Sequence, residues 1–221
     1  MLQEKSICLI MPVYNEEKNI VEVIQKIPSF IDEIIIVDDK STDSTLIKLE
    51  PQLKTNEKIK LIKKNKNEGA GSAKRDGYIY AKETKHDIFV TIDGDGQMAL
   101  EDIKRLVKPL IQDDIDFTKA NRLNHAKVFE KMPKHRFFGN AILTLLTKVA
   151  SGYWHVTDTQ TGFTACNRKV IDTLPFENLY TSYGYPNHLL VMLNVFNFKV
   201  RDIASDPIYN VGEKSNINAL T

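Results

Sequence analysis

Short apolar runs alternate with amphipathic stretches through the first half of the chain. The apolar runs occupy residues 7–13, 33–37, 58–62 and 87–92. The stretches between them carry apolar residues at helical spacing, which predicts helices at 16–27, 41–53 and 70–82. Apolar strands that are separated by helices are typical of a mostly parallel sheet covered on both faces. The pattern therefore predicts an α/β fold.

After residue 92 the alternation becomes less regular. We expect further helices at 100–111 and 186–196, and strands at 115–120, 161–167 and 199–204. A long amphipathic helix lies between them, and we expect its apolar face to pack into the core. That face consists of Phe138, Ile142, Leu145 and Val149. No repeat or linker-like stretch interrupts the chain, so a single domain over residues 1–221 is predicted.

Composition and charge narrow the class of protein. The 221 residues are 42% hydrophobic and 27% charged, as in folded soluble domains. Thirty basic residues against 29 acidic ones leave a net charge of +1, so the charge of the whole chain predicts neither a nucleic-acid nor a bilayer partner. No signal peptide opens the chain, and no run reaches the roughly 18 apolar residues of a membrane span. Two cysteines, Cys8 and Cys166, are too few for a disulfide framework, so we expect a soluble protein in the cytoplasm.

Polar residues follow each of the four apolar runs in the first half. These strand-end segments are 12–16, 38–43, 65–77 and 93–97. In an open parallel sheet, ligands bind outside the carboxyl ends of the strands. The sequence therefore predicts one binding site built from all four segments.

The segment Asp93-Gly94-Asp95-Gly96-Gln97 carries the most specific chemistry. If the segment is extended, residues two apart point the same way and both carboxylates share one small site. Two carboxylates at close range repel unless a cation lies between them, and oxygen ligands favour Mg²⁺ or Mn²⁺. Such ions are commonly held by one or two carboxylates together with substrate phosphates. The alternative is an Asp-Gly turn that merely ends the strand.

Other motif interpretations fit less well. An EF-hand that starts at Asp93 would need glycine and an acidic residue where Met98 and Lys104 stand. A phosphatase with an Asp-x-Asp nucleophile should carry it after the first strand, whereas here it follows the fourth. The turn after the first strand lacks glycine, which excludes a P-loop and a dinucleotide fingerprint. The small residues at 69–73 are expected instead to allow close approach between a helix and a ligand or between a helix and the sheet.

Taken together, the motifs resemble those of family 2 glycosyltransferases with the GT-A fold. The matching segments, in order, are Met11-Pro-Val-Tyr-Asn-Glu, Val37-Asp-Asp-Lys-Ser-Thr-Asp, Asn67-Glu-Gly-Ala-Gly-Ser-Ala-Lys-Arg, Asp93-Gly-Asp-Gly-Gln, Asp158-Thr-Gln-Thr-Gly-Phe and Gly212-Glu-Lys-Ser. They span nearly the whole chain, and the later ones are most similar to the dolichyl- and polyprenyl-phosphate branch. The resemblance implies a Rossmann-like three-layer sandwich, with a nucleotide-sugar-binding half at 1–97 and an acceptor half at 98–221.

The resemblance also implies roles for individual residues. The nucleotide sugar would be bound by Pro12, Tyr14, Glu16, Asp38, Asp39, Gly69, Lys74 and Asp93. The metal, Mg²⁺ or Mn²⁺, would be held by Asp95 and Gln97. The catalytic set would consist of Asp93, Asp95, Asp158, Arg122 and Arg136.

The implied activity is inverting transfer of a sugar from a UDP- or GDP-sugar, and the acceptor decides which groups are needed. A sugar hydroxyl of a glycan must lose a proton, which calls for a base such as Asp158. A lipid phosphate is already ionised and needs cations instead. Residues 127–136 contain five basic side chains counting His135, and Lys214 lies in the tail. This favours the lipid phosphate over the glycan. A catalytically idle nucleotide-sugar-binding module and the Asp-x-Asp phosphohydrolase are the alternatives from other classes.

Three departures from the branch qualify the resemblance. Gly94 and Gly96 stand where alanine and leucine are frequent, which predicts a looser metal loop, and residues 158–162 replace Asp-Pro-Met-Ser-Gly. Branch members often carry membrane helices after the Gly-Glu-Lys-Ser motif, whereas this chain stops at Thr221. We therefore expect a truncated protein that contacts the cytoplasmic face of a membrane. Trp154 would line an acceptor groove, meet the membrane interface or pack in the core.

Overall fold

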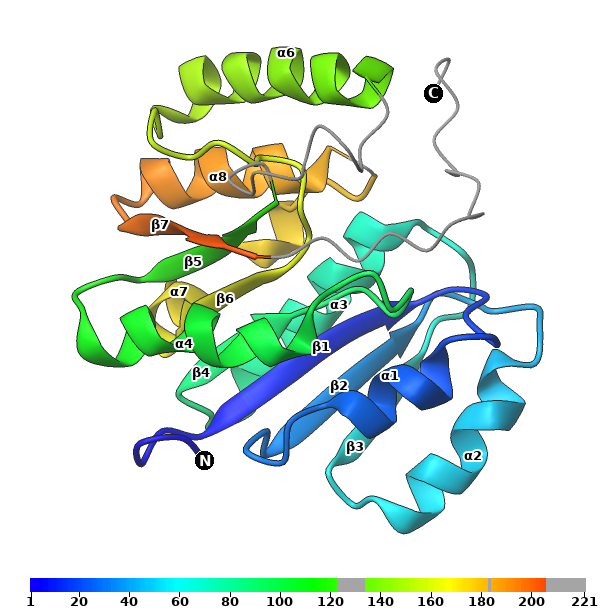
Figure 1. The fold of residues 1–221 in the computed structure, drawn as a ribbon. Helices are drawn as coiled ribbons and strands as arrows, with labels where there is room; N and C mark the ends of the chain where they lie inside the picture. Colours follow the sequence, from blue (N-terminus) through cyan, green and yellow to red (C-terminus); the bar gives the residue numbers. More distant parts are fainter. Residues whose placement is uncertain (123–133, 183, 206–221) are drawn as a thin grey trace.

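The computed structural model describes residues 1–122, 134–182 and 184–205, without the side chains of 134–141. Within these residues, seven strands form one sheet in the order β3-β2-β1-β4-β6-β5-β7 (Figure 1). The strands are β1 (Ile7–Val13), β2 (Glu33–Asp38), β3 (Ile59–Lys63), β4 (Ile88–Thr91), β5 (Phe117–Asn121), β6 (Thr164–Asn167) and β7 (Val200–Ala204). The α-helices are α1 (Ile20–Lys26), α2 (Thr45–Thr55), α3 (Ala70–Glu83), α4 (Ile103–Gln112), α6 (Lys134–Ser151), α7 (Arg168–Thr173) and α8 (Tyr185–Val195). Two short 3₁₀ helices lie at Leu100–Asp102 and Phe176–Asn178.

The sheet is mostly parallel, as predicted. Strands β3, β2, β1 and β4 run in one direction, and β5 pairs in parallel with β7. Only β6 opposes its neighbours β4 and β5 among the described strands. The parallel run brings the carboxyl ends of β1, β2 and β4 to the same edge, where the sequence predicts the site.

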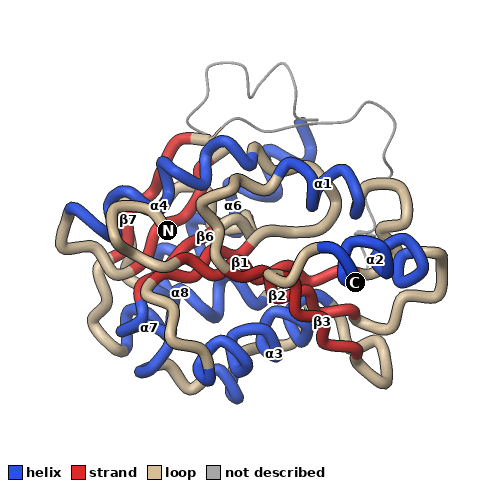
Figure 2. Tube along the Cα trace, turned by 90° about the horizontal axis from the view of Figure 1, so that it is seen from below, coloured by secondary structure: helices blue, strands red, loops and turns tan. Residues whose placement is uncertain are grey.

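Helices cover both faces of the sheet, which gives three layers (Figure 2). Alternate residues of β1 point to opposite sides, since Cys8 and Ile10 belong to one core cluster and Leu9 and Met11 to the other. The first cluster includes residues of α3, α7 and α8, and the second includes residues of α1, α2 and α4. Both core clusters draw on the first and second halves of the chain.

Loop hydrogen bonds explain why α2 begins later than the predicted residue 41. The side-chain oxygen of Asn15 accepts from the backbone N–H of Thr42 at 2.8 Å, which ties residues 41–43 to the end of β1. The helix then starts at Thr45, whose N–H donates to the carboxylate of Asp43 at 2.9 Å. Helix α7 was not predicted, because six residues are too few for a periodic signal; Asn167 caps it by accepting from the N–H of Val170.

The prediction that α6 packs its apolar face into the core is wrong for the side chains described. Ile142, Leu145 and Val149 are 62%, 56% and 66% exposed. Phe138 lies outside the described side chains. The helix is buried instead through Thr144 and Thr147, on the side that packs against α8. Among the described helices, none is long and apolar enough to cross a bilayer.

Candidate active site

The loops after β1 and β2 are joined by backbone and side-chain hydrogen bonds. The N–H of Asp39 donates to the carbonyl of Val13 at 2.9 Å, and the N–H of Glu16 donates to Thr45 Oγ1 at 2.8 Å. Pro12 is buried within this arrangement, whereas Tyr14 is 44% exposed. The Tyr14 ring is therefore open to a ligand, and contact of Pro12, Tyr14 and Glu16 with a nucleotide stays a prediction.

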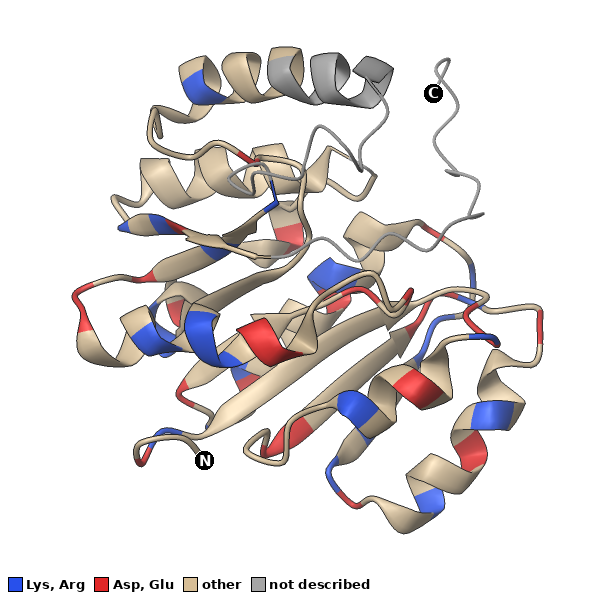
Figure 3. Ribbon diagram, in the orientation of Figure 1, with Lys and Arg blue, Asp and Glu red and all other residues tan. Residues whose placement is uncertain are grey.

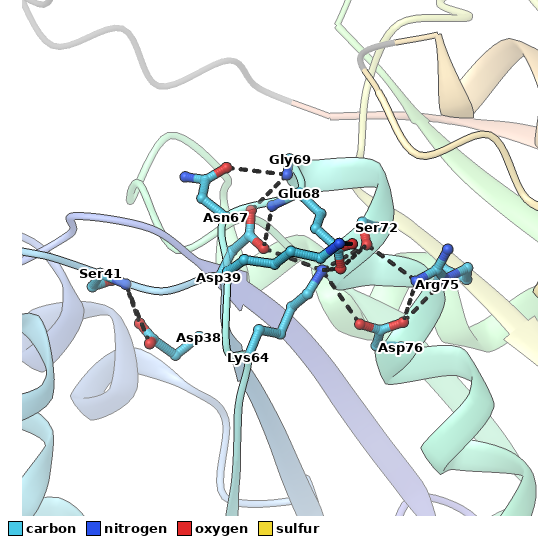
Figure 4. A network of polar contacts seen from close by, with 11 residues as sticks. Asp38, Asp39, Ser41, Lys64, Asn67, Glu68, Gly69, Ser72, Arg75 and Asp76 are labelled. Atoms are coloured by element: carbon cyan, nitrogen blue, oxygen red, sulfur yellow. Dashed lines mark hydrogen bonds and ion pairs between the residues drawn. The ribbon is translucent and has the colours of Figure 1, made fainter.

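Asp38 and Asp39 are buried and organise the neighbouring loops (Figure 4). The Asp39 carboxylate accepts from the N–H of Gly69 at 2.7 Å and from that of Glu68 at 3.1 Å. Asp38 accepts from the N–H of Ser41 at 3.3 Å. Gly69 takes φ +92°, a conformation that glycine adopts without strain, and α3 starts at the next residue. These carboxylates thus shape the loops around the predicted base and ribose site, and their direct contact with a nucleotide stays a prediction.

Lys64 holds this network together and was missed by the sequence analysis. Its ammonium lies 3.2 Å from Asp39, 3.0 Å from Glu68 and 3.3 Å from a carboxylate oxygen of Asp76 (Figure 4). Burial disfavours its charge, but the hydrogen bonds to Glu68 and Asp39 outweigh burial and raise the pKa of Lys64. A lysine after a strand carries no local signal of this role, because Asp39 follows a different strand and Asp76 lies on α3.

Lys74 reaches from α3 to the candidate metal loop. Its Nζ lies 2.6 Å from Asp93 Oδ1 and also donates to the hydroxyl of Tyr185, at the start of α8. The side chain is 1% exposed; burial disfavours its charge, but Asp93 outweighs burial and raises the pKa of Lys74. Tyr185, a second residue missed by the sequence analysis, joins the two predicted halves of the site at this point.

Gly162 fits tightly against the same three side chains. A Cβ at this position would lie 2.3 Å from Lys74 Nζ, 2.6 Å from the Tyr185 hydroxyl and 2.7 Å from Asp93 Oδ2. The loop at 158–162 therefore packs directly onto Lys74 and Asp93. Only glycine leaves room for this contact.

The candidate metal loop is a turn, which corrects the expectation of an extended segment. Residues 94 and 95 form a turn, and Gly96 has φ +75°. A Cβ at Gly94 would lie 2.6 Å from Val13 Cγ1, so glycine lets the loop pack against the end of β1 rather than loosening it. The loop closes on itself, since Asp95 Oδ1 accepts from the N–H of Gln97 at 2.9 Å.

The loop suits a magnesium or manganese ion. Asp93, Asp95 and Gln97 offer carboxylate and amide oxygens, the ligand type these ions prefer. In the described part of the chain, no third His, Cys, Asp or Glu gathers with Asp93 and Asp95 into a preformed ligand cluster. That arrangement fits an ion bound by one or two carboxylates and completed by substrate phosphates. Asp95 and Gln97 as metal ligands stay a prediction.

A pocket of about 550 Å³ opens beside this loop. Asp93, Asp95 and Gly96 line one side of it, and residues 19–28 around α1 line the other. Of the residues predicted to bind the nucleotide, only Asp93 borders this pocket. Both aspartates of the motif therefore face one space despite the turn between them.

At the end of β5, the partly exposed Arg122 pairs with the buried Asp158. Asp158 Oδ2 accepts from Arg122 Nε at 2.7 Å and from its backbone N–H at 3.1 Å, while Oδ1 accepts from Nη2 at 3.1 Å. The Asp158 side chain is 2% exposed and that of Arg122 is 30% exposed. Burial would raise the pKa of the Asp158 carboxyl, but the charge of Arg122 outweighs it and holds this pKa below its usual value.

The charge of Arg122 also reaches the Lys74 cluster. Burial raises the pKa of the Tyr185 hydroxyl, whereas Lys74 and Arg122 both act to lower it. The Lys119 ammonium, buried on β5, donates to the carbonyl of Thr161 in the loop that packs on Lys74. The Tyr185 hydroxyl therefore lies within the electrostatic influence of Arg122, Lys74 and Asp93. Lys214 and the basic stretch at 127–136, which includes Arg136, lie outside the described side chains.

A family model described as "Glycosyl transferase family 2" matches residues 8–174. The chain belongs to glycosyl transferase family 2. Among its relatives, UDP-N-acetylglucosamine–dolichyl-phosphate N-acetylglucosaminyltransferase of Methanococcus voltae is 33% identical and aligns over 94% of this chain and 88% of its own length. Dolichol-phosphate mannosyltransferase of Pyrococcus furiosus is 28% identical over 75% of this chain and 47% of its own. The predicted family and enzyme class are confirmed: this family 2 chain is a glycosyltransferase.

Solved structures confirm the fold of this family 2 member. Glucosyl-3-phosphoglycerate synthase from Mycobacterium tuberculosis matches with a TM-score of 0.72 and 21% identity, over 96% of this chain and 74% of that one. The same protein in complex with Mn²⁺, UDP and phosphoglyceric acid matches with a TM-score of 0.67 and 21% identity, over 91% of this chain and 69% of that one. The family 2 chain has the GT-A fold.

Proposed function

We propose that this glycosyltransferase moves a sugar from a nucleotide diphosphate sugar to a polyprenyl phosphate, with inversion at the anomeric carbon and with Mg²⁺ or Mn²⁺. The observation that carries the proposal is the ion pair between the partly exposed Arg122 and the buried Asp158. It provides a fixed cation where the acceptor is predicted to bind, and it leaves Asp158 poorly suited to act as a base.

A hydroxyl acceptor would require a general base with a pKa near the working pH. The Asp158 side chain is 2% exposed, both of its oxygens accept hydrogen bonds from Arg122, and the pKa of its carboxyl is lowered. Such a carboxylate holds a proton weakly and is shielded from a substrate. Its geometry instead orients the Arg122 guanidinium, which can grip a phosphate through two N–H groups. We therefore favour the lipid phosphate over the glycan hydroxyl.

In this proposal, different residues of the chain bind the acceptor and hold the metal loop. Arg122 binds the acceptor phosphate, and a phosphate oxygen attacks the anomeric carbon as the bond to the donor diphosphate breaks. No proton needs to be removed from the acceptor. Lys74 fixes Asp93 at the edge of the metal loop, and Asp95 and Gln97 would hold the ion. When bound, a divalent cation supplies positive charge that stabilises the leaving diphosphate.

The relatives support the same acceptor class, since two of them are named for transfer to dolichyl or dolichol phosphate. We propose that the donor is a UDP-sugar or a GDP-sugar. Because the acceptor is a lipid, we place the reaction at a membrane surface, on the cytoplasmic side where nucleotide sugars are available.

An acceptor comparison tests this proposal. The enzyme is offered a labelled UDP- or GDP-sugar with Mn²⁺ and either a polyprenyl phosphate or the matching free polyprenol. We expect transfer to the phosphate only, and a product of inverted anomeric configuration by proton NMR coupling constants. Transfer to the polyprenol at a similar rate would contradict the proposal.

Asp158→Asn separates the two roles of this residue. If Asp158 orients Arg122, loss of its carboxylate should raise the KM for polyprenyl phosphate roughly tenfold, as expected for loss of a charged hydrogen bond. The kcat should stay within a few fold of the wild-type value. Asp172→Asn is the matched control. Asp172 also pairs with an arginine, since its Oδ1 lies 3.2 Å from Arg168 Nη1, and this pair lies on α7, outside the candidate site. A fall in kcat of about a thousandfold with unchanged KM would identify Asp158 as a base instead.

A further inference from the structure

Over residues 142–149, where its side chains are described, helix α6 presents several large apolar side chains to solvent. Ile142, Leu145, Leu146 and Val149 are 62%, 56%, 61% and 66% exposed. Their spacing of three and four residues places them along one stripe of the helix. We call this stripe, together with the 43% exposed Leu143, the outer face of α6. Exposed apolar positions that gather on one surface mark an interaction site, whereas isolated ones do not.

The opposite side of α6 is tied to the loop that holds Asp158. Thr144 Oγ1 donates to the carbonyl of Thr157 at 3.3 Å and lies 3.4 Å from the hydroxyl of Thr159. Helix α6 lies at the periphery of the molecule and packs on α8 (Figure 1). A partner on the outer face of α6 would therefore lie about one helix diameter, ~10 Å, from the loop that positions Arg122.

The charge of α6 is of one sign. Its 18 residues include Lys134, Arg136 and Lys148 and no acidic residue. Figure 3 shows the described part of the helix with a single basic band and no acidic one. Trp154, three residues beyond the end of the helix, is 62% exposed. Aliphatic residues on one face, basic residues and a neighbouring tryptophan are typical of helices that lie in a membrane interface.

We infer that the outer face of α6 docks onto an anionic lipid bilayer, with its aliphatic side chains among the acyl chains and Lys148 at the headgroups. The inference rests on the proposed function, because docking here sets the headgroup layer beside the loop of Arg122 and Asp158. A second copy of the chain fits this surface less well. A two-fold contact would place the basic helix against itself, and the like charges would repel.

A matched pair of substitutions tests the docking surface. Ile142→Glu adds a charge to the outer face of α6, and Ile47→Glu adds the same charge to an isoleucine that is 68% exposed on α2, in the opposite helical layer. Co-sedimentation measures binding to vesicles of phosphatidylcholine with and without phosphatidylglycerol. We expect wild type and Ile47→Glu to bind the anionic vesicles alike, and Ile142→Glu to bind roughly tenfold more weakly.

Three outcomes would overturn the inference: no vesicle binding by the wild type, equal binding by the two variants, or binding unaffected by the anionic lipid. A wild-type dimer in sedimentation equilibrium that Ile142→Glu dissociates, without vesicle binding, would assign the surface to a second copy. The vesicle measurement needs no turnover, so it is separate from the proposed activity. With a short-chain, water-soluble polyprenyl phosphate, Ile142→Glu should keep the wild-type rate. Transfer to no polyprenyl phosphate at all would contradict the proposed function and leave the docking result intact.

Discussion

Two buried lysines near the site show how the hydrogen-bond partner of an ammonium group determines its pKa. Lys74 and Lys119 are 1% and 2% exposed. Burial opposes the charge of both, but Lys74 lies 2.6 Å from the Asp93 carboxylate and its pKa is raised. The Lys119 ammonium donates to a carbonyl, and burial lowers the pKa of Lys119 to about 8 although Asp158 and Asp202 act against this. Lys74 is therefore a fixed positive charge, whereas Lys119 changes charge in mildly alkaline solution.

Lys119→Met should reveal this difference in the pH dependence of stability. Between pH 8 and 10.5 the unfolded chain keeps the Lys119 proton and the folded chain releases it. The free energy of unfolding of the wild type should therefore rise relative to that of Lys119→Met across this window. Urea denaturation at pH 7.5 and pH 10 measures it, and other groups cancel in the comparison. A constant difference between the two proteins would contradict the lowered pKa.

Gly162→Ala should damage the site without unfolding the protein. The added Cβ would displace Lys74 or Asp93, because it would lie 2.3 Å from Lys74 Nζ and 2.7 Å from Asp93 Oδ2. Loss of this charged contact should weaken binding of nucleotide and Mn²⁺ by about tenfold in a calorimetric titration. Gly184→Ala is the control, since its Cβ would meet only the half-exposed Tyr180 ring, at 3.2 Å. Equal affinity in the two variants would argue against a role for this contact.

Residues that belong to a recognisable motif after a strand could be predicted from the sequence, whereas residues that act through partners elsewhere in the chain could not. Asp93 and Asp95 were predicted from their spacing and their place after β4, and both line one pocket. Lys64 and Tyr185 were missed, because their partners lie on other segments and no local pattern marks them. Asp158 was singled out, but its pairing with Arg122 depends on a contact across 36 residues.

Helix α3 approaches the sheet closely at Gly77, where only glycine leaves room. A Cβ at Gly77 would lie 2.5 Å from Ile10 Cγ2 on β1 and 3.4 Å from Val37 Cγ2 on β2. At the start of the same helix, a Cβ at Gly71 would meet the backbone carbonyl of Thr181 at 2.7 Å. The close neighbour of Gly71 is thus a loop rather than the sheet, and the close helix–sheet contact expected at 69–73 is found instead at Gly77.

Gly77→Ala tests the packing of this element. Overpacking against the buried Ile10 costs ~1–3 kcal/mol, which exceeds the roughly 1 kcal/mol that alanine gains over glycine within a helix. We expect a net loss of stability on the order of 1 kcal/mol by urea denaturation. Glu83→Ala, at an exposed position of the same helix, should change stability by no more than about 0.5 kcal/mol. A stabilised Gly77→Ala would show that α3 can move away from the sheet without cost.

Elements with a strong apolar pattern were predicted best. Strand β1 has the predicted bounds, Ile7–Val13, because it is buried throughout its length. The wrong environment of α6 has a different origin. A helix with one apolar stripe has the same sequence pattern whether that stripe packs in a core or faces a membrane. The buried side of α6 carries Thr144 and Thr147, which give no hydrophobic signal in the sequence.

At the scale of the whole molecule, the two predicted halves share one sheet and two cores. Strand β4 of the first half pairs with β6 of the second, and Lys74 of the first contacts Tyr185 of the second. Separating residues 1–97 from 98–221 would break the pairing of β4 with β6 and divide both core clusters. The division at 1–97 and 98–221 therefore describes predicted roles of the residues rather than separate bodies.

The central claim is that the loop after β4 binds a nucleotide diphosphate together with a divalent cation. Calorimetric titration of UDP and GDP, with and without Mn²⁺, tests it on the wild type, Asp95→Asn and Glu101→Gln. Glu101 lines the same pocket and controls for the loss of one negative charge. We expect Mn²⁺-dependent binding of one nucleotide to the wild type and Glu101→Gln, and its loss in Asp95→Asn. A folded wild-type protein that binds neither nucleotide, or an Asp95→Asn variant that binds as the wild type does, would contradict the account.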